Sequence, residues 1–432
     1  MVTTSAIRKM LPHLEFGYAV IALFALTQGP VYQLWNESGL RLDILPSPSI
    51  AHVHFATFLA IQLPGVLLWL RRVDAGWLRI LPNQALLAYL CWLGLSVVWS
   101  TFARQSLPEF LALVLTSFFG LYLTSSFSRL QLWLIVTLGM AIGLISSWWA
   151  IVRVWPAALN VESGYWVGIY YNRNSLAPVA TMAILGSVGV FLTLPKKYRM
   201  VLSTYAASMI VAGFIFLLKS QSRTSLIAVA LAVMSVFSYW FLTHIHRPRK
   251  LANLIKQWSV SLVLFVTMVS TFLAIRLVLS SSRLPNDLVF FNSRQQVWSV
   301  NWSGILEKPI VGWGWMAAWY NSDFKKLGEW WVLWETQWSH NSYHDILLGG
   351  GAIAAILFCC FIVAASKLIG SEISRSNHVI VVGSTTFILV SATQESFFVG
   401  SHFLWALLIC QLGSYNRDSG LSIQEQKSAW RP

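Results

Sequence analysis

Long apolar runs separated by short polar turns constrain this chain more than any other feature of its sequence. A helix that crosses the hydrocarbon layer of a membrane needs about 20 apolar residues. Runs of about this length lie near 14–34, 50–70, 84–102, 109–126, 130–152, 174–195, 200–219, 224–243, 258–280, 343–366, 378–398 and 399–413. The pattern predicts an all-α, polytopic membrane protein of about 12 transmembrane helices, built as a single integral membrane domain over residues 1–432. Charged residues make up only 11% of the chain, against about 25% in a soluble domain.

The basic residues predict how these helices are oriented. With the amino terminus in the cytoplasm, the inner turns hold 18 of the 30 lysines and arginines, in agreement with the positive-inside rule. Both termini are then cytoplasmic, and the long polar segment 281–342, between helices nine and ten, lies outside. The net charge of +14 therefore indicates membrane orientation. It does not indicate a nucleic-acid partner, because no recognisable nucleic-acid-binding module is visible.

Cysteine and acidic residues give little support to a metal site. All four cysteines lie within apolar runs, which argues against structural disulfides and against a CxxC metal site. The acidic residues of the outer turns are scattered, without a carboxylate pair or a DxD motif. We therefore expect no metal and no cofactor.

The outer segment 281–342 is the only long polar interruption, and it contains nine tryptophans. From Arg294, the residues Trp298, Trp302 and Ile305 follow at helical spacing, which predicts an amphipathic helix beginning near Arg294. Such a helix fits a membrane interface, where tryptophan is favoured. It fits a glycan-handling surface equally well, because exposed indole rings stack on sugars. Both interpretations stay open. The candidate residues for a glycan or acceptor surface are Trp298, Trp338 and Asn341.

Several outer cations depart from the positive-inside rule. Arg173, Lys219 and Arg223 lie at or just inside the predicted outer ends of helices. Charges at such depths are costly and usually face a cavity, although long side chains also snorkel to the interface. In GIYYNRNSLAPVA, Arg173 stands where a helix begins, and a helix N-terminus suits phosphate. Asn172 or Asn174 could also simply cap that helix.

Three of the outer residues have the chemistry that a phosphate-handling site needs. Lys219 and Arg223 are four residues apart, so they share a face if their helix is continuous, an arrangement that favours an anion between them. His340, in WSHNSYHDILLGGG, precedes the next apolar run and is the natural base near neutral pH. A structural role is the commoner one for a lone histidine at such a position, and His344 is the local competitor.

Four motifs together resemble the O-antigen ligase family, the ligase/polymerase superfamily of bacterial surface polysaccharides. They are GIYYNRNSLAPVA, QSRTSL, SRQQVW followed by KPIVGWGW, and SHNSYHDILLGGG, and they cover roughly residues 160–370. The resemblance implies a metal-independent membrane glycosyltransferase of the bacterial inner membrane with its active site on the periplasmic side. The donor would be an undecaprenyl-diphosphate-linked glycan, and the acceptor a hydroxyl of a glycan, lipid or polysaccharide.

The resemblance also implies roles for single residues. Arg223 and Arg294 match the arginines that contact the diphosphate, and Arg173 matches a basic residue that often precedes the asparagine. His340 matches the histidine expected to deprotonate the acceptor hydroxyl. A repeat-unit polymerase of the same superfamily is the alternative. A polysaccharide or lipid transporter is a further one, but it would place ionisable residues near the midplane with paired broken helices.

Overall fold

A computed structural model of the chain describes residues 4–31, 48–153, 158–159, 164–244, 258, 289–321, 338–372 and 375–413. Within these ranges the regular elements are helices, apart from an isolated bridge between Leu159 and Trp166. Six of the described helices are long and apolar enough to cross a membrane. The predicted all-helical class is thus confirmed for the described residues, whereas the count of twelve stays a prediction. Residues 259–280 of the predicted ninth run, and residues 281–288 and 322–337 of segment 281–342, lie outside the described residues.

The observed helices follow the apolar runs closely in the middle of the chain and less closely at its ends. In chain order they are α1 (Thr4–Ala25), α3 (Pro48–Arg72), α4 (Leu81–Ser96), α5 (Ala103–Ser126), α6 (Arg129–Val152), α7 (Arg173–Thr193), α8 (Arg199–Ser220), α9 (Arg223–His244), α11 (Val289–Glu307), α13 (Ser342–Glu372), α14 (Arg375–Ser391) and α15 (Phe403–Leu412). The predicted first run, 14–34, is interrupted, because α1 ends at Ala25 and Gln28, with φ +68°, leaves the helical region.

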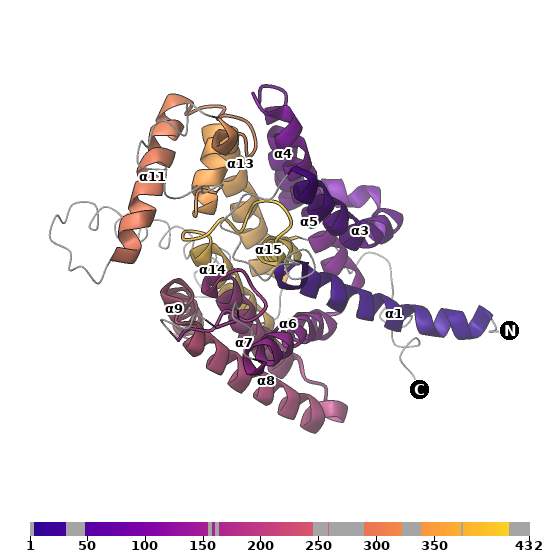
Figure 1. The fold of residues 1–432 in the computed structure, drawn as a ribbon. Helices are drawn as coiled ribbons and strands as arrows, with labels where there is room; N and C mark the ends of the chain where they lie inside the picture. The colour runs from indigo at the N-terminus through magenta and orange to yellow at the C-terminus, as the bar shows by residue number, and fades with distance from the viewer. Residues whose placement is uncertain are drawn as a thin grey trace.

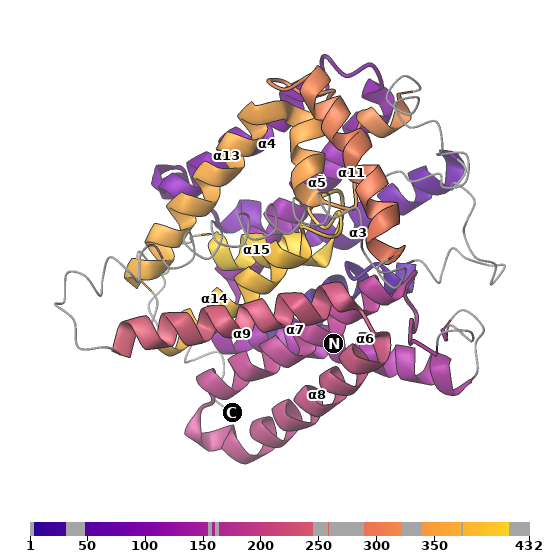
Figure 2. The same ribbon diagram turned by 90° about the vertical axis from the view of Figure 1, so that its left-hand side faces the viewer.

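The helices form groups around a central short helix. Helix α7 packs against α6 and α8, while α14 packs against both α9 and α7. On another side, α13 packs against α4 and α11, and α3 packs against α5. Figures 1 and 2 show α15 between the group that contains α13 and α4 and the group that contains α7 and α9. The interior of the described chain is therefore organised around the segment that leads into α15.

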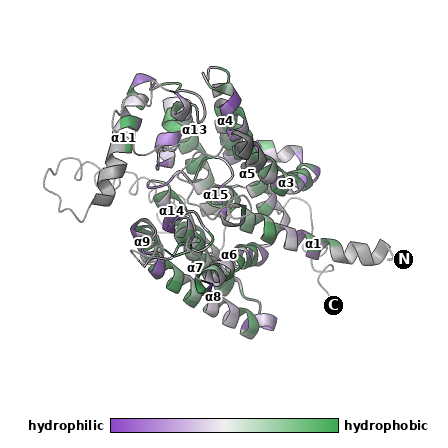
Figure 3. Cartoon of the chain, viewed as in Figure 1, coloured by the Kyte–Doolittle hydropathy of each residue, from purple (hydrophilic) through white to green (hydrophobic). Residues whose placement is uncertain are grey.

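Apolar residues predominate along the helices (Figure 3). Helix α8 exposes Met200, Val211 and Phe214, and α9 exposes Phe237. A soluble protein rarely leaves such a continuous apolar surface uncovered, whereas lipid accommodates it without cost. These exposed faces support the assignment as a multi-pass membrane protein.

Helix α13 is broken, and the sequence between α11 and α13 fills the break. Gly351 has φ +66° and ψ −164° inside α13, a conformation that is essentially confined to glycine. A Cβ at this position would collide with the carbonyl of Ile310. Backbone hydrogen bonds join the two segments: Trp313 N to Leu348 O at 2.7 Å, Gly314 N to Gly349 O at 3.1 Å and Ala352 N to Pro309 O at 2.8 Å. The motifs KPIVGWGW and ILLGGG thus form one unit.

The chain between α14 and α15 is the second irregular segment of the interior. The predicted runs 378–398 and 399–413 are almost continuous, but α14 ends at Ser391 and α15 begins only at Phe403. Residues 392–402 are non-helical and mostly buried. The hydroxyl oxygen of Ser342 accepts hydrogen bonds from the backbone N–H groups of Phe397 (2.8 Å) and Phe398 (3.1 Å). Irregular backbone at membrane depth is tolerated where protein covers it or where it lines a cavity.

Candidate active site

Helix α7 begins with an arginine beside the site. The side-chain oxygen of Asn172 accepts the backbone N–H of Ser175 at 3.0 Å, which is the usual N-terminal cap. Arg173 is therefore the first helical residue, and its guanidinium lies over the ring of Tyr165, 4.7 Å from the ring centroid. Of the two asparagines predicted as possible caps, Asn172 is the one that caps α7. The side-chain amide of Asn174 is therefore available for other contacts.

Helix α9 also begins with an arginine. The backbone N–H of Ser225 donates to the Ser222 hydroxyl at 3.4 Å, so Ser222 stands at the cap position and Arg223 is the first residue of α9. Arg223 is exposed and makes no ion pair with the residues that the structure describes. A cation is disfavoured at a helix N-terminus, where the helix dipole and free N–H groups favour an anion. Two such starts, each carrying an arginine, indicate an anion-binding role.

Lys219 does not share a helical face with Arg223. Helix α8 ends at Ser220, and Gln221 adopts a left-handed conformation with φ +51° before α9 begins. Lys219 and Arg223 therefore lie on two different helices, and the condition for a shared helical face is not met. Lys219 lies in the last turn of α8, where the helix dipole favours a cation, and its ammonium lies 5.9 Å from the centroid of the Trp166 ring.

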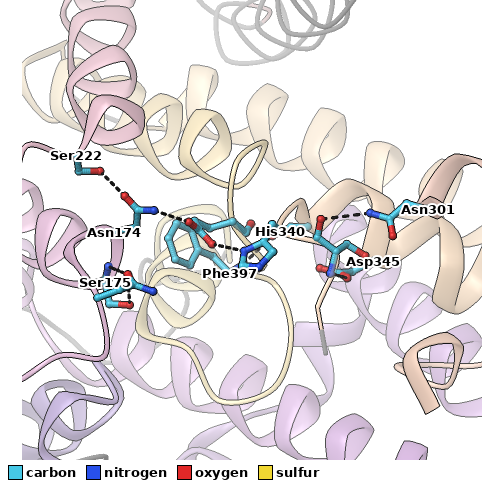
Figure 4. Close-up of polar contacts among 11 residues, drawn as sticks. Asn174, Ser175, Ser222, Asn301, His340, Asp345 and Phe397 are labelled. Carbon is cyan, nitrogen blue, oxygen red and sulfur yellow. Dashed lines mark hydrogen bonds and ion pairs between the residues drawn. The ribbon is translucent and has the colours of Figure 1, made fainter. Parts of the chain in front are cut away.

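A chain of hydrogen bonds links the starts of α7 and α9 to His340. The Ser222 hydroxyl donates to the side-chain oxygen of Asn174 at 2.9 Å. The Asn174 amide N–H donates to Glu395 Oε1 at 2.8 Å, and Glu395 Oε2 lies 3.0 Å from His340 Nδ1. Figure 4 shows Asn174 between Ser222 and His340. Side chains from four separate parts of the chain thus meet at one place.

The partner of His340 Nδ1 determines which ring nitrogen is free to act as a base. A carboxylate only accepts hydrogen bonds, so Nδ1 carries the proton that is shared with Glu395. The lone pair of the neutral ring then lies on Nε2. The side chains of His340 and Glu395 are 27% and 12% exposed, so the pair is sheltered but still reachable. This is the arrangement that a general base requires.

The backbone of His340 is held in an unusual conformation. Its φ is +48°, and the left-handed region costs a non-glycine residue about 1–2 kcal/mol. The neighbouring residues hold this conformation through hydrogen bonds. Ser339 N donates to Asp345 Oδ1 at 3.3 Å, Ser339 O accepts from Asn301 Nδ2 at 3.2 Å, and Ser342 N donates to Ala392 O at 2.8 Å. Such strain persists where the surroundings over-determine it, and it is common at functional sites.

The predicted glycan surface is only partly exposed. Trp298 is 5% exposed and packs with Val297, Trp313 and Trp319 in a buried cluster, so its ring serves packing and is not available to stack on a sugar. Trp302 is 50% exposed. The buried face of α11 is therefore rotated from the predicted stripe, and the fully buried Asn301 lies on it. Trp338 is 46% exposed.

Asn341 has a structural role in the described contacts. Its side-chain oxygen accepts the backbone N–H groups of Tyr343 (2.9 Å) and His344 (3.2 Å), and it is 4% exposed. It therefore caps α13 directly after His340. Arg294 lies within α11, as the motif predicts, but α11 begins earlier, at Val289, and the Arg294 side chain lies outside the described part of the chain.

Glu395 escaped the sequence prediction although a signal for it exists. The predicted helix 378–398 absorbed it, because one carboxylate barely lowers the mean hydropathy of a long apolar run. An ionisable residue inside such a run is itself a candidate functional residue. His402 lies in the same non-helical segment, seven residues further along the chain. Its Nδ1 accepts the backbone N–H of Leu404 at 3.2 Å, so this ring stays neutral and caps α15.

These features define a multi-pass helical membrane protein with a carboxylate–histidine pair next to two arginine-bearing helix starts. No group of three metal-ligating side chains occurs among the residues that the structure describes. Comparison with curated proteins finds no match. Residues 207–359 match the family described as O-antigen ligase. The match confirms the resemblance drawn from the motifs: over these residues the chain is similar to the O-antigen ligase family. The matched residues include Arg223, Arg294 and His340, and exclude Arg173, Asn174 and Glu395.

Proposed function

We propose that this protein is a membrane glycosyltransferase that transfers a glycan from an undecaprenyl-diphosphate carrier to an acceptor hydroxyl. The observation that carries the proposal is the His340–Glu395 pair, which is hydrogen-bonded through Asn174 to the starts of α7 and α9. We place the reaction at the periplasmic face of the bacterial inner membrane, with segment 281–342 on that side. The family match supports this type of enzyme.

The diphosphate of the donor would bind where α7 and α9 begin. Arg173 and Arg223 stand at the first positions of these helices, and the free N–H groups and dipoles of both starts favour an anion. Arginine binds phosphate oxygens in pairs, which lysine does not. Arg294 would approach from α11 as a further phosphate contact, and Lys219 would add positive charge from the end of α8.

The chemical step requires one base and a stabilised leaving group. The Nε2 atom of His340 accepts the proton of the acceptor hydroxyl while that oxygen forms a bond to the anomeric carbon of the donor sugar. The bond from this carbon to the diphosphate oxygen breaks, and its electron pair leaves with the polyprenyl diphosphate. The arginines stabilise the added charge on the diphosphate. Glu395 stabilises the imidazolium that forms, and the proton is then released to solvent.

The acceptor would approach His340 from the side of Trp338. This ring is exposed and precedes His340 by two residues, so it could stack on a sugar of a glycan acceptor. A ligase and a repeat-unit polymerase differ only in which acceptor enters here. We favour the ligase, because the matching family is described as O-antigen ligase.

The test is to delete the gene in its host and to analyse the surface glycans and the lipid-linked glycans. We expect a finished glycan to accumulate on its polyprenyl diphosphate carrier and to vanish from its acceptor. A loss of chain length would instead indicate the polymerase, and unchanged glycans would contradict the proposed function. Donor extracted from the deletion strain then serves as the probe for purified protein. His340→Ala should abolish transfer, and His13→Ala, which removes an exposed histidine of α1, is the matched control.

A further inference from the structure

Asn174 uses both ends of its side-chain amide in the site. Its oxygen accepts the Ser222 hydroxyl at 2.9 Å, and its N–H donates to Glu395 Oε1 at 2.8 Å. The carboxylate fixes this orientation, because the reversed amide would place its oxygen against a carboxylate oxygen. Since Asn172 already caps α7, Asn174 is not needed as the cap. Its contacts therefore serve Glu395 and the start of α9.

We propose that Asn174 is a positioning residue, whose amide holds the Glu395 carboxylate against His340. This inference rests on the proposed function, because it assigns Asn174 a role only through the base. Sequence separation makes the contact informative: Asn174 and Glu395 are 221 residues apart, and Asn174 and Ser222 are 48 apart. No local turn brings them together, so only the packing of α7, α9 and α14 does.

The physical need for a positioning donor follows from the length of the Glu395 side chain. Glutamate has three rotatable side-chain bonds, and fixing a long side chain costs conformational entropy. The carboxylate accepts from Asn174 with Oε1 and from His340 with Oε2, so these two hydrogen bonds together set how Oε2 is presented to the ring. Without the Asn174 donor, the carboxylate would lose one of the two bonds and would present Oε2 to the imidazole in a less fixed geometry.

The chain from Ser222 through Asn174 also links two steps of the reaction. Ser222 stands at the cap of α9, directly before Arg223, and Asn174 directly follows Arg173. A shift of either helix start on binding the diphosphate would therefore move the amide that orients Glu395. The position of the base is thereby tied to the position of the site that binds the leaving diphosphate. Preorganised groups of this kind lose none of their geometry at the moment of reaction.

The experiment is a double-mutant cycle between Asn174→Ala and Glu395→Gln, with donor extracted from the deletion strain as the probe. If Asn174 acts through Glu395, N174A lowers kcat by about 10- to 100-fold, as loss of an orienting partner does in other sites. In the E395Q background it then lowers kcat less than about threefold, because coupled residues are non-additive. The KM for the donor changes little in comparison. Effects that multiply, or an effect on KM alone, would overturn the proposal.

A second variant tests the donor directly. Asn174→Asp keeps the size of the side chain but removes the N–H donor and places two carboxyl groups side by side, so kcat should fall at least as far as in N174A. Full kcat in N174D would contradict the proposal. Ser187→Ala is the control, because that buried hydroxyl bonds only within α7, to Ala183 O at 2.7 Å. If both Asn174 variants fail to fold while S187A folds, Asn174 is a structural residue and the proposal fails.

The two proposals fail separately. An active His340→Ala variant removes the base and with it the proposed mechanism, whatever the cycle shows. An inactive H340A together with multiplying effects of N174A and E395Q leaves the glycosyltransferase intact and removes only the role of Asn174.

Discussion

Two polar clusters flank His340, and they serve different parts of the same residue. The ring-side cluster consists of Ser222, Asn174 and Glu395, and it contacts the imidazole. The backbone-side cluster consists of Asn301, Ser339 and Asp345, and it fixes the chain just before His340. Figure 4 shows Asn174 and Asn301 on opposite sides of the histidine. The ring is thus oriented from one side and its backbone from the other.

The clusters differ in exposure and in how well their polar atoms are satisfied. Glu395 and His340 remain partly exposed, whereas Asn301 and Ser339 are 0% and Asp345 is 3% exposed. In the backbone-side cluster, Asn301 Oδ1 has no hydrogen-bond partner among the described residues. A buried unsatisfied polar group costs about 1–3 kcal/mol. Stability alone does not explain this cluster, whereas holding the left-handed backbone of His340 does.

The largest effect should come from the ring-side cluster. Glu395→Gln keeps the hydrogen bond to the ring possible but removes the charge that stabilises the imidazolium, so kcat should fall about 100-fold. The thermal midpoint in detergent should change little, because the carboxylate is partly exposed. Transfer rates and unfolding curves measured on one preparation check both. An E395Q variant with normal kcat would show that the two clusters are both structural.

A substitution in the backbone-side cluster should mainly lower the stability of the protein, in contrast to E395Q, which should mainly lower kcat. Asn301→Ala removes the donor to the Ser339 carbonyl and to His344, and leaves buried acceptors unpaired at a cost of about 1–3 kcal/mol. Thermal unfolding in detergent measures it. Ser303→Ala is the control on the exposed side of α11, where, among the described residues, the hydroxyl bonds to Ser299 O at 3.1 Å. Equal stability of N301A and S303A would remove the distinction between the clusters.

A smaller effect is expected at the start of α9, next to the ring-side cluster. Arg223→Ala should lower kcat/KM for the lipid-linked donor about tenfold, and Arg223→Lys should restore part of it, because lysine keeps the charge without the paired donors. Arg199→Ala, at the exposed start of α8, should have no effect. Equal losses in R223A and R199A would indicate a general effect of net charge on membrane assembly.

The smallest effect is expected at Trp338, beyond either cluster. Trp338→Ala should raise the KM for a glycan acceptor a few-fold, since a ring contact of this kind contributes about 0.5–1.5 kcal/mol. Trp302→Ala, on an exposed tryptophan of α11, is the matched control. Initial rates at varied acceptor and saturating donor give the comparison. An effect at Trp302 of the same size would favour a membrane-interface role for both rings.

The sequence alone placed the helix starts and most of the residues in the proposed mechanism. Helices α6 to α9 begin within about a residue of the predicted apolar runs, because an apolar run of sufficient length predicts a span whatever its neighbours. Arg173, Arg223 and His340 were found as polar residues at the edges of those runs. The long-range contacts were not found. Glu395 was counted inside a helix, and Trp298 was expected on a surface that the packing of α11 buries.

Apolar length and basic turns thus determined the membrane-spanning class of this chain, because partition of a helix into lipid depends on its own composition. Only the tertiary structure decided which polar side chains face one another. The break at Gln221 is a local left-handed turn, whereas the breaks at Gly351 and between Ser391 and Phe403 are held by contacts with distant segments. With these breaks in place, Ser222, Asn174, Glu395 and His340 form one chain of hydrogen bonds. The sequence around each residue does not indicate which distant residue it will contact.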